Sequence, residues 1–241
     1  MTNQRRKALE GKEKTFAISM VLSMVLWNIP FGSELMLPFK FFTTFVHESC
    51  HALVMALSGA GVEGIEIFAD TSGTTKAQIS AAPWAKPIIA SAGYIGTSLI
   101  GALLLAGTKN ADRSKMTLFL FGALILLMGL LWSSNTTTMV IAVTIFSLVV
   151  VLVVEPFNWV REIVHVFCAL QLSLHAVLDI RVLFNPNLVI NGETVGLSDA
   201  HNMAALTFGT PTLWAAIWIG CSLIGLWIGL KLAYSIPSGP P

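Results

Sequence analysis

The chain has 241 residues, of which 55% are hydrophobic and only 11% are charged, and its formal net charge is +1. Soluble domains average roughly 45–50% apolar and about 25% charged residues, so this composition excludes an ordinary soluble protein and indicates a membrane protein. Nucleic-acid binding is also disfavoured, because it requires basic residues spread over an exposed face.

The chain begins with a basic tail, residues 1–14, in front of the first apolar run. Five basic side chains gather there: Arg5, Arg6, Lys7, Lys12 and Lys14. Short cytoplasmic segments of membrane proteins carry such an excess of lysine and arginine. We therefore expect a cytoplasmic N-terminus, which would make the second span run inward.

Seven apolar runs follow, separated by short polar segments. The expected spans are 15–29, 40–57, 84–106, 116–132, 139–155, 160–184 and 211–233. A spanning helix needs about 20 predominantly apolar residues. The predicted fold class is an all-α membrane protein, a polytopic bundle of about six to seven transmembrane helices. It forms one domain over residues 15–234, followed by a flexible tail at 235–241.

One stretch, residues 60–82, departs from this helical pattern. Val62, Ile65, Ile67 and Phe68 precede a polar turn at residues 70–73, and a second short run follows. Apolar residues in alternation around a glycine-containing turn are typical of two paired strands. We expect a small β-hairpin-like insert here.

Two of the spans carry unusual residues. The span at 84–106 contains small side chains that would let another helix approach closely: Ala92, Gly93, Gly96, Thr97 and Gly101. The span at 160–184 contains polar and charged ones: Arg161, Glu162, His165, Gln171, His175, Asp179 and Arg181. Ionisable groups inside a membrane are costly and indicate function. The following residues, 185–199, read as a loop.

The second span contains His47-Glu48-Ser49-Cys50-His51, an H-E-x-x-H sequence. A spacing of four places both imidazoles on one helical face, where they can bind a single zinc ion. Zinc lowers the pKa of a bound water to about 7, and a neighbouring carboxylate can take its proton. Glu48 is the expected general base of a zinc-dependent hydrolase.

A catalytic zinc usually has three protein ligands, so one must come from another segment. Asp179 is the leading candidate, because it shares roughly one helical face with His165 and His175 in the expected span at 160–184. His175 is the main rival ligand, and a salt bridge of Asp179 with Arg181 is the alternative without a metal. His165 is expected to be a packed or hydrogen-bonded residue.

These residues together resemble the site-2 protease class of membrane-embedded zinc metallopeptidases, in particular its compact members. The resemblance covers most of residues 40–210. It rests on the sequence around His47 to His51, the glycine-rich insert, Ala92-Gly93-Tyr94-Ile95-Gly96 and Leu178-Asp179.

The resemblance implies that His47, His51 and Asp179 bind zinc and that Glu48 activates the zinc-bound water. It also implies a membrane-spanning protein substrate in the lipid bilayer, cut by a metalloendopeptidase reaction, and an insert edge that pairs with the unwound substrate. The class commonly follows its aspartate with glycine, whereas Ile180 follows here, so Asp199 remains a second candidate ligand.

Two other functions use the same histidine helix. A transmembrane zinc transporter can carry H-E-x-x-H within a span, and His201-Asn202 is faintly similar to a second transporter ligand pair, but Ala205 stands where a partner aspartate is expected. A catalytically silent metal-binding membrane protein would not need Glu48. The sequence therefore favours the protease.

Overall fold

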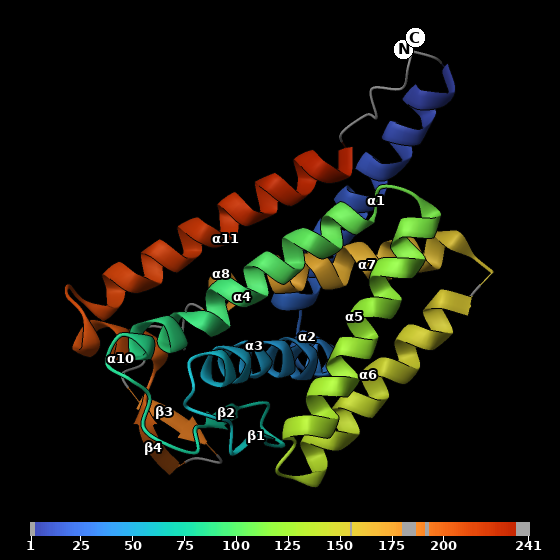
Figure 1. Cartoon of the computed structure of the whole chain (residues 1–241). Coiled ribbons are helices and arrows are strands. Elements are labelled where there is room, and N and C mark those ends of the chain that lie inside the picture. The colour runs from blue at the N-terminus through green and yellow to red at the C-terminus, as the bar shows by residue number, and fades with distance from the viewer. Residues whose placement is uncertain (1–2, 155, 180–186, 191–192, 235–241) are drawn as a thin grey trace.

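The computed structural model describes residues 3–154, 156–179, 187–190 and 193–234 (Figure 1). The described helices are α1 Asn3–Asn28, α2 Gly32–Leu35, α3 Leu37–Leu57, α4 Ala85–Gly107, α5 Ala111–Trp132, α6 Thr136–Val154, α7 Asn158–Ser173, α8 His175–Leu178, α10 Asp199–Leu206 and α11 Pro211–Tyr234. The described strands are β1 Gly64–Ile67, β2 Gly73–Lys76, β3 Asn187–Ile190 and β4 Glu193–Leu197. They form two antiparallel hairpins, so the predicted helical fold with a small hairpin is confirmed in outline.

Helix α4 lies at the centre of the bundle, with α3 and α7 on one side and α11 along the other (Figure 1). Its small residues make this packing close. A Cβ atom at Gly96 would lie 2.5 Å from Sγ of Cys50 on α3, and one at Gly101 would collide with Ser173 on α7. The prediction that small residues in this span admit neighbouring helices is confirmed.

Four of the described helices are long and apolar enough to cross a membrane: α4, α5, α6 and α11. The predicted six to seven spans are therefore not confirmed. Helix α7 has only 16 residues, and α3 carries Lys40 and the H-E-x-x-H residues among its apolar ones. Helix α7 is thus shorter than the about 20 residues that a span needs, and the polar residues of α3 lower its mean hydropathy.

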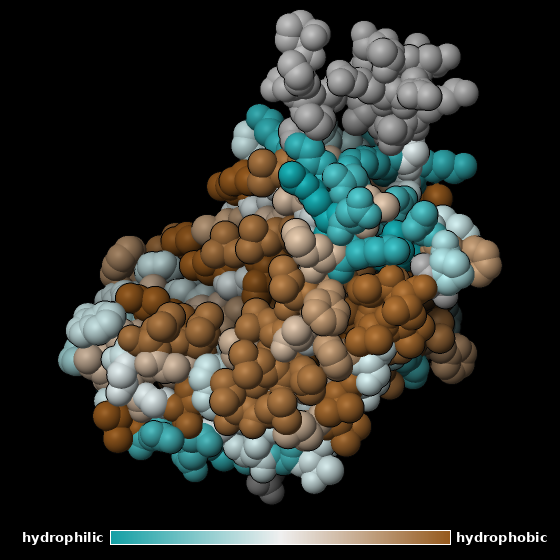
Figure 2. Space-filling view, turned by 45° about the vertical axis from the view of Figure 1, so that its right-hand side comes forward, coloured by the Kyte–Doolittle hydropathy of each residue, from teal (hydrophilic) through white to brown (hydrophobic). Residues whose placement is uncertain are grey.

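The surface has the character of a membrane protein. Figure 2 shows a broad hydrophobic face between hydrophilic residues at two opposite ends of the molecule. Large apolar side chains of α5 and α6 are exposed, among them Leu120, Leu131, Val140 and Val151 at 56–59%. Such a continuous exposed apolar surface is suited to lipid rather than to water.

The insert at 60–82 is the predicted hairpin. Strand β1 pairs with β2 in the register Gly64 with Lys76 and Ile67 with Gly73. Ile65 and Ile67 are completely buried. The backbone N–H of Ile67 donates to Thr138 in the first turn of α6, and its carbonyl accepts from Asn135, just before that helix. Strand β1 is thus fixed to the bundle, while β2 lies against α3.

Two expectations for the later chain are wrong. The span expected at 160–184 is not one helix, because α7 ends at Ser173 and the short α8 starts at His175 after Leu174. The loop expected at 185–199 contains the hairpin β3–β4, with a register shift between Leu188 and Val189. Residues 180–184 and the tail at 235–241 lie outside the described residues.

Candidate metal centre

Helix α3 presents His47, Glu48 and His51 toward the inside of the molecule. All three are buried, with 8%, 7% and 6% of their surfaces exposed. The ring of His47 lies directly on α4, where a Cβ atom at Gly93 would overlap the imidazole. Only glycine leaves room for the ring at this position, so Gly93 is a condition for the placement of His47.

His51 is oriented by the first turns of α4. Its Nδ1 lies 2.7 Å from the carbonyl oxygen of Ile89. A carbonyl can only accept, so Nδ1 carries a proton and donates, which leaves Nε2 with a free lone pair. Metal-binding histidines are commonly oriented in this way.

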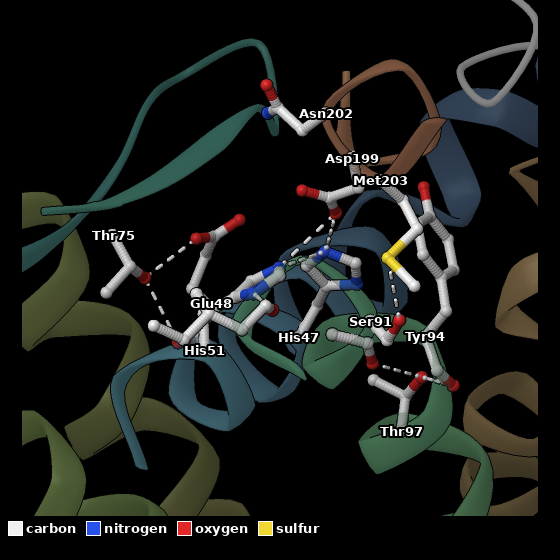
Figure 3. Close-up of polar contacts among 12 residues, drawn as sticks. His47, Glu48, His51, Thr75, Ser91, Tyr94, Thr97, Asp199, Asn202 and Met203 are labelled. Atoms are coloured by element: carbon white, nitrogen blue, oxygen red, sulfur yellow. Dashed lines mark hydrogen bonds and ion pairs between the residues drawn. The ribbon is translucent and has the colours of Figure 1, made fainter. Parts of the chain in front are cut away.

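Asp199 reaches the two histidines from α10, far along the chain. It is the first residue of that helix, directly after Ser198, and α10 is anchored by Ala200 and Met203, which pack with Trp218 of α11. Oδ2 of Asp199 lies 3.1 Å from Nε2 of His47 and 3.3 Å from Nε2 of His51 (Figure 3). The tertiary fold thus joins residues that are 152 positions apart.

These three donors fit a zinc ion. Nε2 of His47 and Nε2 of His51 are 3.0 Å apart, and one ligand atom from each of His47, His51 and Asp199 lies within 4.8 Å of the others. Oδ2 of Asp199 faces both of these nitrogens, so a carboxylate oxygen lies beside the two imidazole donors. Two imidazoles and one carboxylate are a donor set that catalytic zinc sites use.

Glu48 lies beside this group and points toward the hairpin (Figure 3). Its Oε2 accepts a hydrogen bond of 2.8 Å from Oγ1 of Thr75, which also donates to the Glu48 backbone carbonyl at 3.0 Å. A Cβ atom at Gly73 would come within 2.8 Å of Cγ of Glu48, so the strand approaches α3 closely. The hairpin therefore sets the direction of the Glu48 carboxylate.

Asp179, the predicted third ligand, is not in the group that the structure brings together among the described residues. Its Oδ2 is 3.5 Å from Nε2 of His175, which in turn lies 3.1 Å from Nδ1 of His47. His165 points elsewhere, because its Nδ1 is 2.8 Å from Oγ of Ser114. The break after Ser173 removes the common face that an unbroken helix would give these three residues.

A cavity of about 960 Å³ opens over the site. Its walls come from α3, the β1–β2 turn and β2, the start of α4, α8 and α10, and they include Glu48, Thr75, His175, Asp179 and Asn202. This volume is at the upper end of what ligand clefts usually enclose. The cavity gives the metal-binding atoms and the Glu48 carboxylate a shared, accessible space.

Sequence reasoning missed the roles of Thr75 and Tyr94. Tyr94 packs edge-on to His47 at 4.7 Å and stacks on His175 and Trp218. Tyr94 lies in the Ala92-to-Gly96 segment of the resemblance, but its contacts and those of Thr75 depend on the pairing of distant segments. A weak sequence signal indicated that Asp199 begins a helix, since acidic residues are favoured in the first turn of a helix.

Comparison with known proteins gives one match. A model of the Peptidase M50B-like family matches residues 15–229, which include every residue of the candidate centre. No curated protein and no solved structure matches the chain. Together with its four apolar helices, the match makes the chain an integral membrane protein and a metallopeptidase-family member. The chain therefore belongs to the Peptidase M50B-like family, in agreement with its resemblance to the site-2 protease class.

Proposed function

We propose that this protein is an intramembrane zinc metalloprotease that hydrolyses peptide bonds in or near the transmembrane segments of other proteins. The observation that carries the proposal is the convergence of His47, His51 and Asp199 beside the carboxylate of Glu48 at the wall of one large cavity. Metal binding alone would not require a carboxylate oriented toward that cavity.

The proposed ligands are His47, His51 and Asp199, with Asp199 in place of Asp179. The two oxygen–nitrogen distances of Asp199, 3.1 and 3.3 Å, support this choice. Asp179 contacts His175 instead. His175 in turn contacts Nδ1 of His47, the ring nitrogen that does not face Asp199.

The zinc ion, when bound, would supply a Lewis acid that polarises the scissile carbonyl and makes water more acidic. Glu48 takes the proton of the attacking water and later delivers it to the leaving amine nitrogen. Thr75 holds Oε2 of Glu48 by a hydrogen bond and leaves Oε1 to handle the proton. Such general acid–base catalysis typically contributes about 10²- to 10⁴-fold.

The exposed apolar helices support a membrane-spanning protein as the proposed substrate, because a substrate within the lipid bilayer could reach this cavity directly. A peptide bond must leave its helix to be hydrolysed, because a helical carbonyl is hydrogen-bonded and shielded. The proposed cytoplasmic N-terminus rests on the basic residues 5–14.

The test measures zinc content and cleavage of a transmembrane reporter by the purified protein. Glu48→Gln should keep zinc and lose cleavage by about 10²-fold or more, because the amide cannot accept the water proton. Glu63→Gln is the matched control, since this glutamate is exposed next to the hairpin and does not line the cavity. It should cleave like the wild type.

Two other outcomes would contradict the proposal. If zinc is bound, no reporter is cut and zinc crosses liposome membranes, the protein is a transporter and Glu48 serves as a ligand. If zinc is bound and neither cleavage nor transport occurs, the centre is a silent metal site.

A further inference from the structure

His175 is an imidazole that contacts the candidate centre from outside the group His47, His51 and Asp199. It is 5% exposed, begins α8 and stacks on Tyr94 with a ring separation of 5.4 Å. Its Nε2 lies 3.1 Å from Nδ1 of His47, whose other nitrogen points to Asp199 and His51. The ring therefore touches the proposed ligand from the side away from the metal position.

The two ligand histidines have different orienting partners. His51 donates from Nδ1 to the carbonyl of Ile89, which is fixed by the backbone of α4. The partner that faces Nδ1 of His47 is a side chain, that of His175. When Nε2 of His47 gives its lone pair to a metal ion, its Nδ1 must carry the proton. The group that faces Nδ1 must then accept a hydrogen bond from it.

Nε2 of His175 can accept this hydrogen bond only when the His175 proton is on Nδ1. The second neighbour of that nitrogen, Oδ2 of Asp179, is farther away at 3.5 Å, so His47 is its nearer partner. Stacking on Tyr94 and the complete burial of Ala176 beside it keep the ring in this position. The contact is thus both specific in its atoms and held by its surroundings.

We propose that His175 is a positioning residue that accepts the Nδ1–H of His47 and so fixes the tautomer and ring direction in which His47 binds zinc. This inference rests on the proposed metal centre and assigns His175 a role behind the ligand rather than as a ligand. Groups in such positions typically contribute about 10- to 100-fold to metal affinity.

The experiment separates hydrogen bonding from packing with two opposite substitutions. His175→Phe keeps a ring against Tyr94 but has no acceptor, whereas His175→Gln loses the ring but keeps an acceptor oxygen. His175→Leu lacks both. The matched control is His165→Phe, a fully buried histidine of α7 that contacts Ser114 away from the cavity.

The measurements are zinc affinity, by competition with a chelator, and the absorption spectrum of the cobalt-substituted protein. His175→Phe and His175→Leu should bind zinc about 10- to 100-fold more weakly and show an altered cobalt spectrum. His175→Gln should restore most of the affinity and the wild-type spectrum. His165→Phe should leave both unchanged in the folded protein.

Three results would overturn the inference. Wild-type zinc affinity in either acceptor-free variant would mean that His47 needs no acceptor. Equal losses in His175→Gln and His175→Phe, with a cobalt spectrum of lower ligand number, would make His175 a ligand. A wild type that binds no zinc would instead remove the proposed function, and this inference with it.

Discussion

Helix α3 and the segment from α8 to α10 contribute to the same site in opposite ways. In α3, two proposed ligands and the proposed base lie within five consecutive residues, and the helix alone places His47 and His51 one turn apart. In the later segment, His175 and Asp199 reach the same histidine from α8 and α10, with the hairpin β3–β4 between them. The spacing of residues within one helix determines one half of the site, and the tertiary path of the chain determines the other half.

The largest effect on zinc binding should come from removing Asp199, the proposed ligand in the later segment. Asp199→Ala should weaken zinc binding by more than roughly 100-fold, which is the most that a group behind a ligand typically contributes. Cleavage should be lost together with the zinc. Zinc content of the purified protein, measured by elemental analysis, checks this.

Asp179→Ala is the matched comparison, because it removes a carboxylate of the same cavity that contacts His175 instead. It should retain most of the zinc. The opposite result, zinc lost in Asp179→Ala and kept in Asp199→Ala, would restore the assignment first suggested by the sequence.

A smaller effect should follow when α4 is made too bulky for the histidine helix. In Gly93→Ala, the added methyl overlaps the ring of His47, and overpacking of this kind costs about 1–3 kcal/mol. Zinc affinity should fall by roughly 5- to 150-fold if the ring absorbs this strain.

Gly220→Ala on α11 serves as its control, since a Cβ atom there meets nothing within 4 Å. This variant should keep zinc affinity. If Gly93→Ala also binds zinc normally, α4 does not constrain His47 as the structure indicates.

The smallest effect should arise at the hairpin. Thr75→Val removes the hydroxyl that donates to Oε2 of Glu48 and should lower the cleavage rate by about tenfold or less, with zinc retained, because one hydrogen bond is lost. Thr75→Ser should restore the rate. Equal rates in the valine and serine variants would show that the hairpin does not orient Glu48.

Much of the fold could be predicted from the apolar runs and the short polar segments between them. Helices α4, α5, α6 and α11 and the hairpin β1–β2 lie within a few residues of their expected positions, since each depends on local hydropathy or turn chemistry. The break at Leu174 carries no proline or glycine, so no local signal indicated that α7 would stop there. The change of the proposed third ligand from Asp179 to Asp199 follows from that break, because the shared face predicted for His165, His175 and Asp179 needs an unbroken helix.

The sequence by itself determined the membrane character and the paired histidines with their glutamate, because these depend on composition and on spacing within one helix. Only the tertiary structure decided that Asp199 rather than Asp179 meets the two histidines, that Thr75 holds Glu48 and that His175 lies behind His47. These contacts join segments that are far apart along the chain, and their geometry depends on how α10, β2 and α8 pack on α3 and α4. No local periodicity encodes that packing.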